Sequence, residues 1–182
     1  APLGIHDPEV RFDLDLDPAD ELAARGIVEA RGLEQFALIN PGAGWPSKLW
    51  PAQRFASVAR HLGLVHGLRT LVMWGNDAER AMAEQIVAGS GGCAVMAPPT
   101  SLSELAAVAR RATLFVGSDT GPLHLASAMG TPCVGLYGPS PLDRNGPYGP
   151  QHSGVQRARL LGSSHERRQA GPESMEAISV AD

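Results

Sequence analysis

Five short apolar segments alternate with amphipathic segments along the middle of this chain, and this alternation constrains the fold more than any other feature. The apolar segments have the length and composition of buried β-strands, and they are Phe36–Asn40, Arg69–Trp74, Cys93–Ala97, Thr113–Gly117 and Pro132–Tyr137. Between them, apolar residues recur at helical spacing in segments that begin at Ala52, Asp77, Ser101 and Leu123. Strands that alternate with helices predict an α/β fold with a doubly wound, parallel, Rossmann-like sheet.

The order of the predicted strands determines where a ligand should bind. We assume the common order 3-2-1-4-5, in which the first and fourth strands are neighbours and the order reverses between them. Ligands of such sheets bind beyond the carboxyl ends of the strands at this reversal. We therefore expect the loop after Phe36–Asn40 to face the loop after Thr113–Gly117 across one crevice.

The loop after the fourth strand has the features of an anion-binding helix start. It reads Ser118-Asp-Thr-Gly-Pro-Leu-His124. Pro122 suits the first turn of a helix, where its missing N–H is not needed, and Thr120 or Asp119 is a suitable N-cap. The free N–H groups near Gly121, together with the helix dipole, would attract a phosphate group.

The loop after the first strand contains the only lysine among the 15 Lys and Arg residues of the chain. Lys48 would place one compact positive charge opposite the helix start, and two sources of positive potential in one crevice suit a diphosphate. The alternative interpretation is that the glycines of this loop make a tight turn while Trp45 and Trp50 pack on the core. The candidate binding residues of this loop are Gly42, Ala43, Ser47 and Lys48.

Two further turns border the same edge of the sheet. Trp74 and Gly75 follow the second strand, and the carboxylates of Asp77 and Glu79 come next. Acidic groups at this position accept hydrogen bonds from ribose hydroxyls in dinucleotide-binding folds, although helix capping by Asp77 is an equally good interpretation. After the third strand, a rigid turn ending at Ser101-Leu102 would wall a nucleobase pocket, or Ser101 would only cap its helix.

Asp119 and His124 are included among the candidate site residues with a second interpretation for each. A carboxylate beside a diphosphate is repulsive, so we expect Asp119 to cap its own helix or to pair with Lys48. His124 lies one turn into the helix. A single helical histidine is more often a packed core residue than a catalytic one, and we favour the packed interpretation.

Composition and missing motifs exclude several functional classes. The formal net charge of −4 argues against nucleic acid as the main partner. No P-loop motif is present and no G-x-G-x-x-G motif opens the first helix, which argues against an NTPase and an NAD-dependent dehydrogenase. No apolar stretch is long enough to span a membrane. Cys93 and Cys133 are expected to be buried, reduced thiols, and we expect no metal and no cofactor.

Four motifs occur in order along the chain, and together they carry a family resemblance. They are Asn40-Pro-Gly-Ala with Ser47-Lys-Leu-Trp-Pro, Trp74-Gly75 with Glu79, Ser118-Asp-Thr-Gly-Pro-Leu-His-Leu-Ala126, and Tyr137-Gly-Pro-Ser140. In order and spacing they resemble the ADP-heptose:lipopolysaccharide heptosyltransferases, glycosyltransferase family nine. The resemblance covers about residues 36–152, and the segment from Glu173 to Ile178 is similar to the closing helix of that family.

The resemblance implies a GT-B enzyme, in which two Rossmann-like domains enclose the active site. This chain resembles the carboxyl-terminal, donor-binding half. The resemblance implies that Lys48 and the amides of Thr120 and Gly121 hold the donor diphosphate, with Lys48 stabilising the leaving group. It also implies that an acidic residue near Glu79 binds the ribose and that the turn at Ser101-Leu102 borders the adenine.

The reaction and partners are likewise implied by the resemblance. The family is inverting, as a rule without a bound metal, and takes its catalytic aspartate from the amino-terminal half. We therefore expect ADP-heptose as donor, a lipid-linked saccharide as acceptor, and a missing amino-terminal domain without which the chain is inactive. We expect a cytoplasmic protein with peripheral contact at the inner membrane, where lipid-linked acceptors lie.

The chain is divided into three parts on these grounds. Residues 1–34 are predicted to be a linker from the missing domain, residues 35–152 the nucleotide-sugar-binding domain, and residues 153–182 a carboxyl-terminal extension with a short helix. Three alternative functions remain: a GT-B domain for another nucleotide sugar, a fragment that only binds nucleotide or docks, and a flavodoxin-like domain. The aromatic content of 5% gives little support to the last.

Overall fold

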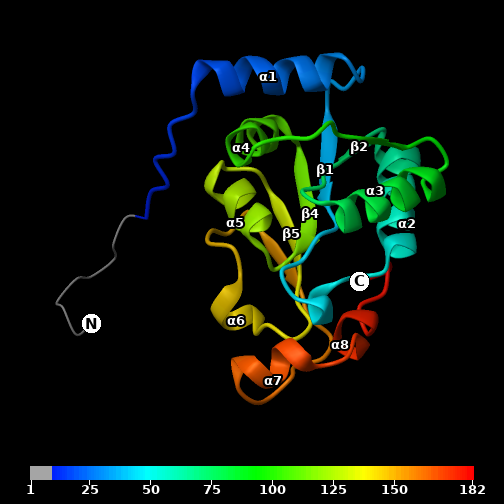
Figure 1. Ribbon diagram of the computed structural model, residues 1–182, viewed down its shortest axis with the longest axis vertical. Coiled ribbons are helices and arrows are strands. Elements are labelled where there is room, and N and C mark those ends of the chain that lie inside the picture. The colour runs from blue at the N-terminus through cyan, green and yellow to red at the C-terminus, as the bar shows by residue number, and fades with distance from the viewer. Residues whose placement is uncertain (1–9) are drawn as a thin grey trace.

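Six parallel strands form the central sheet of the computed structural model, which describes residues 10–182 (Figure 1). In spatial order they are β3 (Ala94–Met96), β2 (Arg69–Val72), β1 (Phe36–Asn40), β4 (Leu114–Ser118), β5 (Cys133–Leu136) and β6 (Ser153–Val155). The predicted α/β class and the predicted order of the first five strands are confirmed. The sixth strand was not predicted, because its three residues are largely exposed and lack an apolar pattern.

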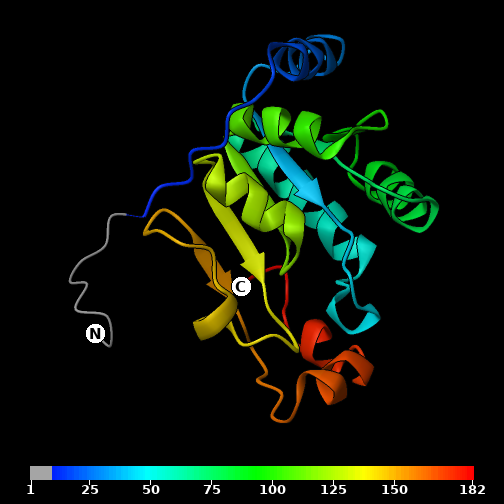
Figure 2. The same cartoon turned by 60° about the vertical axis from the view of Figure 1, so that its left-hand side comes forward.

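The longer helices form a layer on each face of this sheet (Figures 1 and 2). One layer consists of α1 (Pro18–Glu29), α4 (Leu102–Arg111) and α5 (Gly121–Ala128). The other consists of α2 (Ala52–His66), α3 (Asp77–Gly89) and the short α8 (Glu173–Glu176). Three short helices lie in loops that follow strands or connect them, and these are the 3-10 helix η1 (Pro46–Lys48), α6 (Leu142–Asn145) and α7 (Ser164–Gln169).

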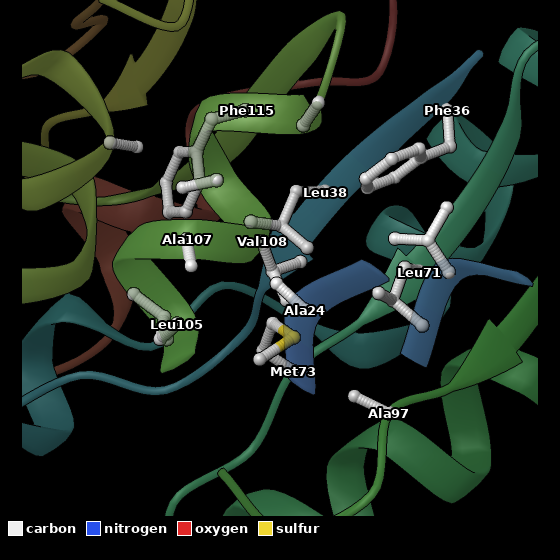
Figure 3. Packing of buried hydrophobic residues seen from close by; sticks show 14 of the residues in the cluster. Ala24, Phe36, Leu38, Leu71, Met73, Ala97, Leu105, Ala107, Val108 and Phe115 are labelled. Atoms are coloured by element: carbon white, nitrogen blue, oxygen red, sulfur yellow. The ribbon is translucent and has the colours of Figure 1, made fainter. Parts of the chain in front are cut away.

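The position of the first strand, β1, is fixed because side chains on both of its faces are buried. Phe36 and Leu38 enter the core beneath α1 and α4, where Figure 3 shows them among side chains of β2, β4 and α4. Ile39 enters the core on the opposite face. All three are fully buried, and each such side chain contributes about 1.5–3 kcal/mol. The carboxyl end of β1, at Asn40, is therefore a rigid base for the loop that follows.

Residues 153–182 contribute to both the sheet and the core. Strand β6 pairs with β5, and the side chains of Met175 and Ile178 are buried in the core beneath α2 and α3. The indole N–H of Trp50 donates a hydrogen bond to the carbonyl of Ile178 at 3.1 Å. The short helix predicted in this segment is α8.

The amino-terminal part and the cysteines differ in detail from expectation. Residues 1–9 of the predicted linker lie outside the described residues, and residues 10–17 have no regular secondary structure before α1 begins. Both cysteines are free, but only Cys133 is buried; Cys93 precedes β3 and is partly exposed, so its predicted burial is wrong. Burial raises the pKa of the Cys133 thiol to about 12. Among residues 10–182, no helix has the length and apolar character needed to cross a membrane.

Candidate functional site

A pocket of about 440 Å³ lies at the carboxyl ends of β1 to β4, where the strand order reverses. This volume is within the range of roughly 300–1,000 Å³ that is typical of small-molecule sites. Ten predicted site residues line the pocket: Gly42, Ala43, Trp74, Gly75, Glu79, Ser101, Leu102, Thr120, Gly121 and Pro122. Four residues that were not among the candidates also line it: Asn40, Gly44, Thr100 and Leu105.

Helix α5 begins at the edge of this pocket without a side-chain cap. Thr120 is the N-cap residue, but its hydroxyl donates to the carbonyl of Ser118 at 3.2 Å and accepts nothing from the helix. The first N–H groups of a helix have no acceptor within the helix itself. The N–H groups of α5 are thus left for a ligand, and the helix dipole adds positive potential where Thr120, Gly121 and Pro122 line the pocket.

The loops after β1 and β4 meet, as the topology predicted. The Lys48 ammonium donates to Oδ2 of Asp119 at 2.7 Å and to the backbone carbonyl of Asp119 at 3.0 Å. The two side chains are only 12% and 5% exposed. Of the two roles expected for Asp119, the structure shows pairing with Lys48 and not capping of α5. The positive charge beside the pocket is therefore partly compensated.

Asp119 is held by two further side chains. Nε2 of His124 lies 3.1 Å from Oδ1 of Asp119, and the Asn145 amide donates to Oδ2 at 3.2 Å. Burial alone would raise the pKa of Asp119, but hydrogen bonds from His124 and Lys48 outweigh it and hold the pKa well below its usual value. The side chain of His124 is 46% exposed, so the packed-core interpretation of this residue is wrong.

Glu79 closes the turn between β2 and α3. Its Oε2 accepts a hydrogen bond from the backbone N–H of Gly75 at 2.7 Å. Its own N–H donates to the side chain of Asn76 at 3.0 Å, so Asn76 caps α3 and the interpretation of Asp77 as the cap is wrong. A Cβ atom on Gly42 would lie 2.2 Å from Oε1 of Glu79. The loop after β1 thus lies against this carboxylate, and a side chain at position 42 would displace it.

The turn before α4 combines capping with a place in the pocket. Ser101 caps α4, as expected, and forms a capping box with Glu104: the Ser101 hydroxyl accepts from the Glu104 N–H at 3.1 Å, and the Glu104 carboxylate accepts from the Ser101 N–H at 2.7 Å. Ser101 also lines the pocket together with Thr100 and Leu102. Capping fixes the position of this wall.

Five predicted site residues lie outside the pocket, and of these Ser47 is furthest from the predicted role. Its hydroxyl is buried and donates to the carbonyls of Arg167 and Arg168 at 3.0 and 3.3 Å, which ties η1 to α7. Direct ligand contacts by these five residues stay predictions. They are Ser47, Lys48, Asp77, Asp119 and His124.

The two tryptophans of the loop after β1 behave differently. Trp50 packs in the core, edge-on to Phe55, as the alternative interpretation had it. Trp45 does not. The Lys48 ammonium and the Arg168 guanidinium both lie against its ring, at 4.3 and 4.8 Å from the centroid. Trp45 therefore helps to set the position of Lys48.

Sequence reasoning missed Asn145, which supports Asp119 from α6. The signal was present, because the segment that contains Asn145 follows the fifth strand and the carboxyl end of that strand is next to that of the fourth. Within residues 10–182, no three His, Cys, Asp or Glu side chains are grouped in a way that could hold a metal ion.

The fold and the pocket define a class of protein. An all-parallel, doubly wound sheet with a ligand-sized pocket at the reversal of strand order is a Rossmann-like α/β domain of the kind that binds nucleotides at this point. The profile of glycosyltransferase family 9 (heptosyltransferase) matches residues 1–173. The chain therefore belongs to glycosyltransferase family 9.

Individual relatives agree with this assignment. Lipopolysaccharide heptosyltransferase 1 of Pseudomonas aeruginosa is 34% identical over 125 residues, which are 64% of this chain and 35% of that protein. The heptosyltransferase 1 of Campylobacter coli is 29% identical over 144 residues, which are 75% of this chain and 42% of that protein. This chain thus spans about two fifths or less of the length of these two relatives.

Solved structures show the same relation. A glycosyl transferase of family 9 from Veillonella parvula matches with a TM-score of 0.81 and 26% identity, over 99% of this chain and 54% of that one. The heptosyltransferase WaaC of E. coli, solved with ADP, matches with a TM-score of 0.68 and 21% identity, over 98% of this chain and 50% of that one. The fold is therefore that of one half of a GT-B glycosyltransferase.

Proposed function

We propose that this chain is the donor-binding half of an inverting heptosyltransferase, which binds ADP-heptose and transfers the heptose to a lipopolysaccharide core acceptor. One observation carries this proposal more than any other. The uncapped start of α5 lines a ligand-sized pocket, and Asp119, which directly precedes the N-cap residue Thr120, is paired with Lys48. A diphosphate is the ligand group that this combination fits best.

The other parts of the nucleotide follow from the lining of the pocket. The diphosphate accepts hydrogen bonds from the backbone N–H groups of Thr120 and Gly121. The ribose hydroxyls donate to the carboxylate of Glu79, which already points at the loop after β1. The adenine lies against Ser101 and Leu102. The solved structures of E. coli WaaC with ADP and with ADP-2-deoxy-2-fluoro heptose support an ADP-sugar as the donor.

Sugar transfer requires stabilisation of the leaving group, ADP. An acceptor hydroxyl attacks the anomeric carbon, the bond from that carbon to the diphosphate breaks, and negative charge grows on ADP. An ammonium has three N–H donors, of which Asp119 engages two, so Lys48 retains one for the leaving group. One preorganised donor of this kind is typically worth about 3–4 kcal/mol in the transition state.

The rest of the enzyme supplies what this half lacks. The base that deprotonates the acceptor hydroxyl comes from the amino-terminal half, so we expect the 182-residue chain to bind nucleotide without transferring sugar. An activity assay with and without an added amino-terminal half tests this point. We place the complete protein in the cytoplasm, in peripheral contact with the inner membrane that carries the acceptor.

Calorimetric titration of the 182-residue chain tests the donor assignment. ADP should bind more tightly than UDP or GDP, and Lys48→Ala should weaken ADP binding severalfold. Arg60→Ala, on the exposed surface of α2, is the matched control and should leave ADP binding unchanged. Preference for UDP would assign the pocket to a different nucleotide sugar, and equal ADP affinity of wild type and Lys48→Ala would remove Lys48 from the site.

A further inference from the structure

A second, smaller pocket of about 140 Å³ lies between the loop after β1, the loop after β5 and α7. It shares no lining residue with the larger pocket. Its volume is well below the roughly 300 Å³ of a typical small-molecule site, so it has room for one ionic group of a ligand and not for a whole ligand. The lining includes Trp45, Ser140, Arg144, Asn145, Ser164 and Arg167.

This pocket contains positive charge that no carboxylate of residues 10–182 neutralises through an ion pair. Arg144 is exposed, and its guanidinium has no hydrogen-bond or ion-pair partner within those residues. The guanidinium of Arg167 donates to the carbonyl of Gly162 and to the hydroxyl of Ser164, which are neutral acceptors. Two guanidinium groups without an anion between them favour an oxyanion, because the planar guanidinium matches carboxylate and phosphate geometry.

A buried donor of the same pocket also lacks an acceptor. The Nε–H of Arg167 is buried and makes no hydrogen bond. The hydroxyl of Ser140, a residue only 3% exposed, lies close to Asp119 and favours the charged form of that carboxylate. Buried donors without partners are rare because each costs about 1–3 kcal/mol. An anion with several oxygens would supply the missing acceptor.

The small pocket is connected to the proposed sugar-transfer site by two residues. Asn145 lines the pocket while its amide donates to Asp119, and Trp45 lines it while its ring contacts the Lys48 ammonium. Under the proposed function, on which this inference rests, the donor diphosphate occupies the start of α5 in the other pocket. A heptose has no charge of its own, so an anionic group in the small pocket would belong to the second substrate.

We propose that the pocket formed by Trp45, Arg144 and Arg167 binds an anionic group, a phosphate or a carboxylate, on the acceptor saccharide. Binding of this group positions the acceptor sugar next to the Lys48–Asp119 pair. The requirement for an anionic acceptor then comes from this half of the enzyme, and the base comes from the other half.

Binding measurements on the 182-residue chain test the proposal. The probes are glucose 6-phosphate, glucuronate and uncharged glucose, each titrated alone and with saturating ADP. We expect one or both charged sugars to bind, glucose not to bind, and ADP not to compete. Arg144→Ala and Arg167→Ala should each weaken the charged sugar about tenfold or more, which is the value of a hydrogen bond to a charged group, and change the ADP affinity less than twofold. The two charged probes distinguish a phosphate from a carboxylate.

Arg159→Ala is the matched control, because Arg159 pairs with Asp143 nearby at 3.2 Å but does not line the pocket. An equal loss of charged-sugar binding in Arg159→Ala would mean that the sugar responds to the general positive charge of this surface and not to a specific site, and it would overturn the proposal. Competition by ADP, or weaker ADP binding in Arg144→Ala, would assign the pocket to the donor and overturn the proposal, as would absence of binding by both charged sugars. Binding of a charged sugar without any binding of ADP would support the anion pocket and contradict the proposed donor instead.

Discussion

The Nζ atom of Lys48 lies 2.7 Å from Oδ2 of Asp119, although the two residues are 71 positions apart in the chain. Each residue belongs to a loop that follows a strand, and the strands β1 and β4 are neighbours. The pair therefore fixes two loops to one another at the point where the sheet reverses its strand order. Its burial makes it a structural element as well as a candidate for catalysis.

Removal of the lysine alone should destabilise the protein strongly. Lys48→Met leaves Asp119 as a buried charge without its cation, and breaking a buried pair in this way costs about 3–5 kcal/mol. Lys48→Met combined with Asp119→Asn should recover most of this loss, because no buried charge remains. Urea unfolding of the four proteins of this cycle measures the coupling, and strictly additive effects would contradict it.

Acid should remove the contribution of Asp119 to stability. Its pKa is held below the ordinary value of 3.8 in the folded protein, so near and below that value the unfolded chain binds more protons than the folded one. The stability contributed by Asp119 is thus complete above the unfolded pKa and is lost as the pH falls toward the folded pKa.

The measurement is the free energy of unfolding of wild type and of Asp119→Asn between neutral pH and pH 2.5. The difference between the two proteins should be constant above about pH 5 and should shrink below pH 4. A difference that grows toward acid pH would mean that the pKa of Asp119 is raised on folding, against its hydrogen bonds to His124 and Lys48.

Replacement of Glu79 should weaken ADP binding only through the lost hydrogen bonds to the ribose hydroxyls. Glu79→Ala removes the acceptor that we assign to the ribose hydroxyls and should weaken ADP binding about tenfold, as expected for a hydrogen bond to a charged group. For 2′,3′-dideoxy-ADP, which has no such hydroxyls, the two proteins should bind equally. Glu84→Ala, which removes an exposed carboxylate paired with Arg80 on the same helix, is the control. An equal loss for both nucleotides in Glu79→Ala would point to a change of the turn at Gly75.

Much of the fold and part of the candidate site could be predicted because they depend on local patterns. Buried strands such as Phe36–Asn40 are recognisable as short apolar runs, and the reversal of strand order then places the loops that contain Lys48 and Thr120 together. The turn residues of α4 form their capping box with near neighbours, so Ser101 and Glu104 could be interpreted without tertiary information.

What could not be predicted depends on contacts between distant segments. Ser47 has the same sequence context whether its hydroxyl faces a ligand or the carbonyls of α7, and only the folded chain shows the second. His124 is exposed although its Nε2 lies 3.1 Å from Oδ1 of the buried Asp119, and this contact is visible only in the folded chain. Strand β6 is recognisable only from its pairing with β5, since its three residues have no apolar pattern.

The carboxyl-terminal segment should prove essential to stability. Met175 of α8 is fully buried, and a Cβ atom on Gly138, next to the end of β5, would lie 2.6 Å from its sulfur. Met175→Ala should therefore cost about 2–5 kcal/mol, because it leaves a cavity in the core beneath α2. Gly138→Ala should also destabilise the protein, because it displaces Met175.

Leu161→Ala is the control for the same segment, because Leu161 is 85% exposed and should change stability by less than about 0.5 kcal/mol. Chemical unfolding followed by tryptophan fluorescence measures all three variants. Trp50, one of the three tryptophans, is hydrogen-bonded to Ile178 just after α8, so detachment of this segment contributes to the change in fluorescence. If Met175→Ala were no less stable than Leu161→Ala, residues 153–182 would be an appendage, and the anion pocket that α7 helps to form would lose its rigid wall.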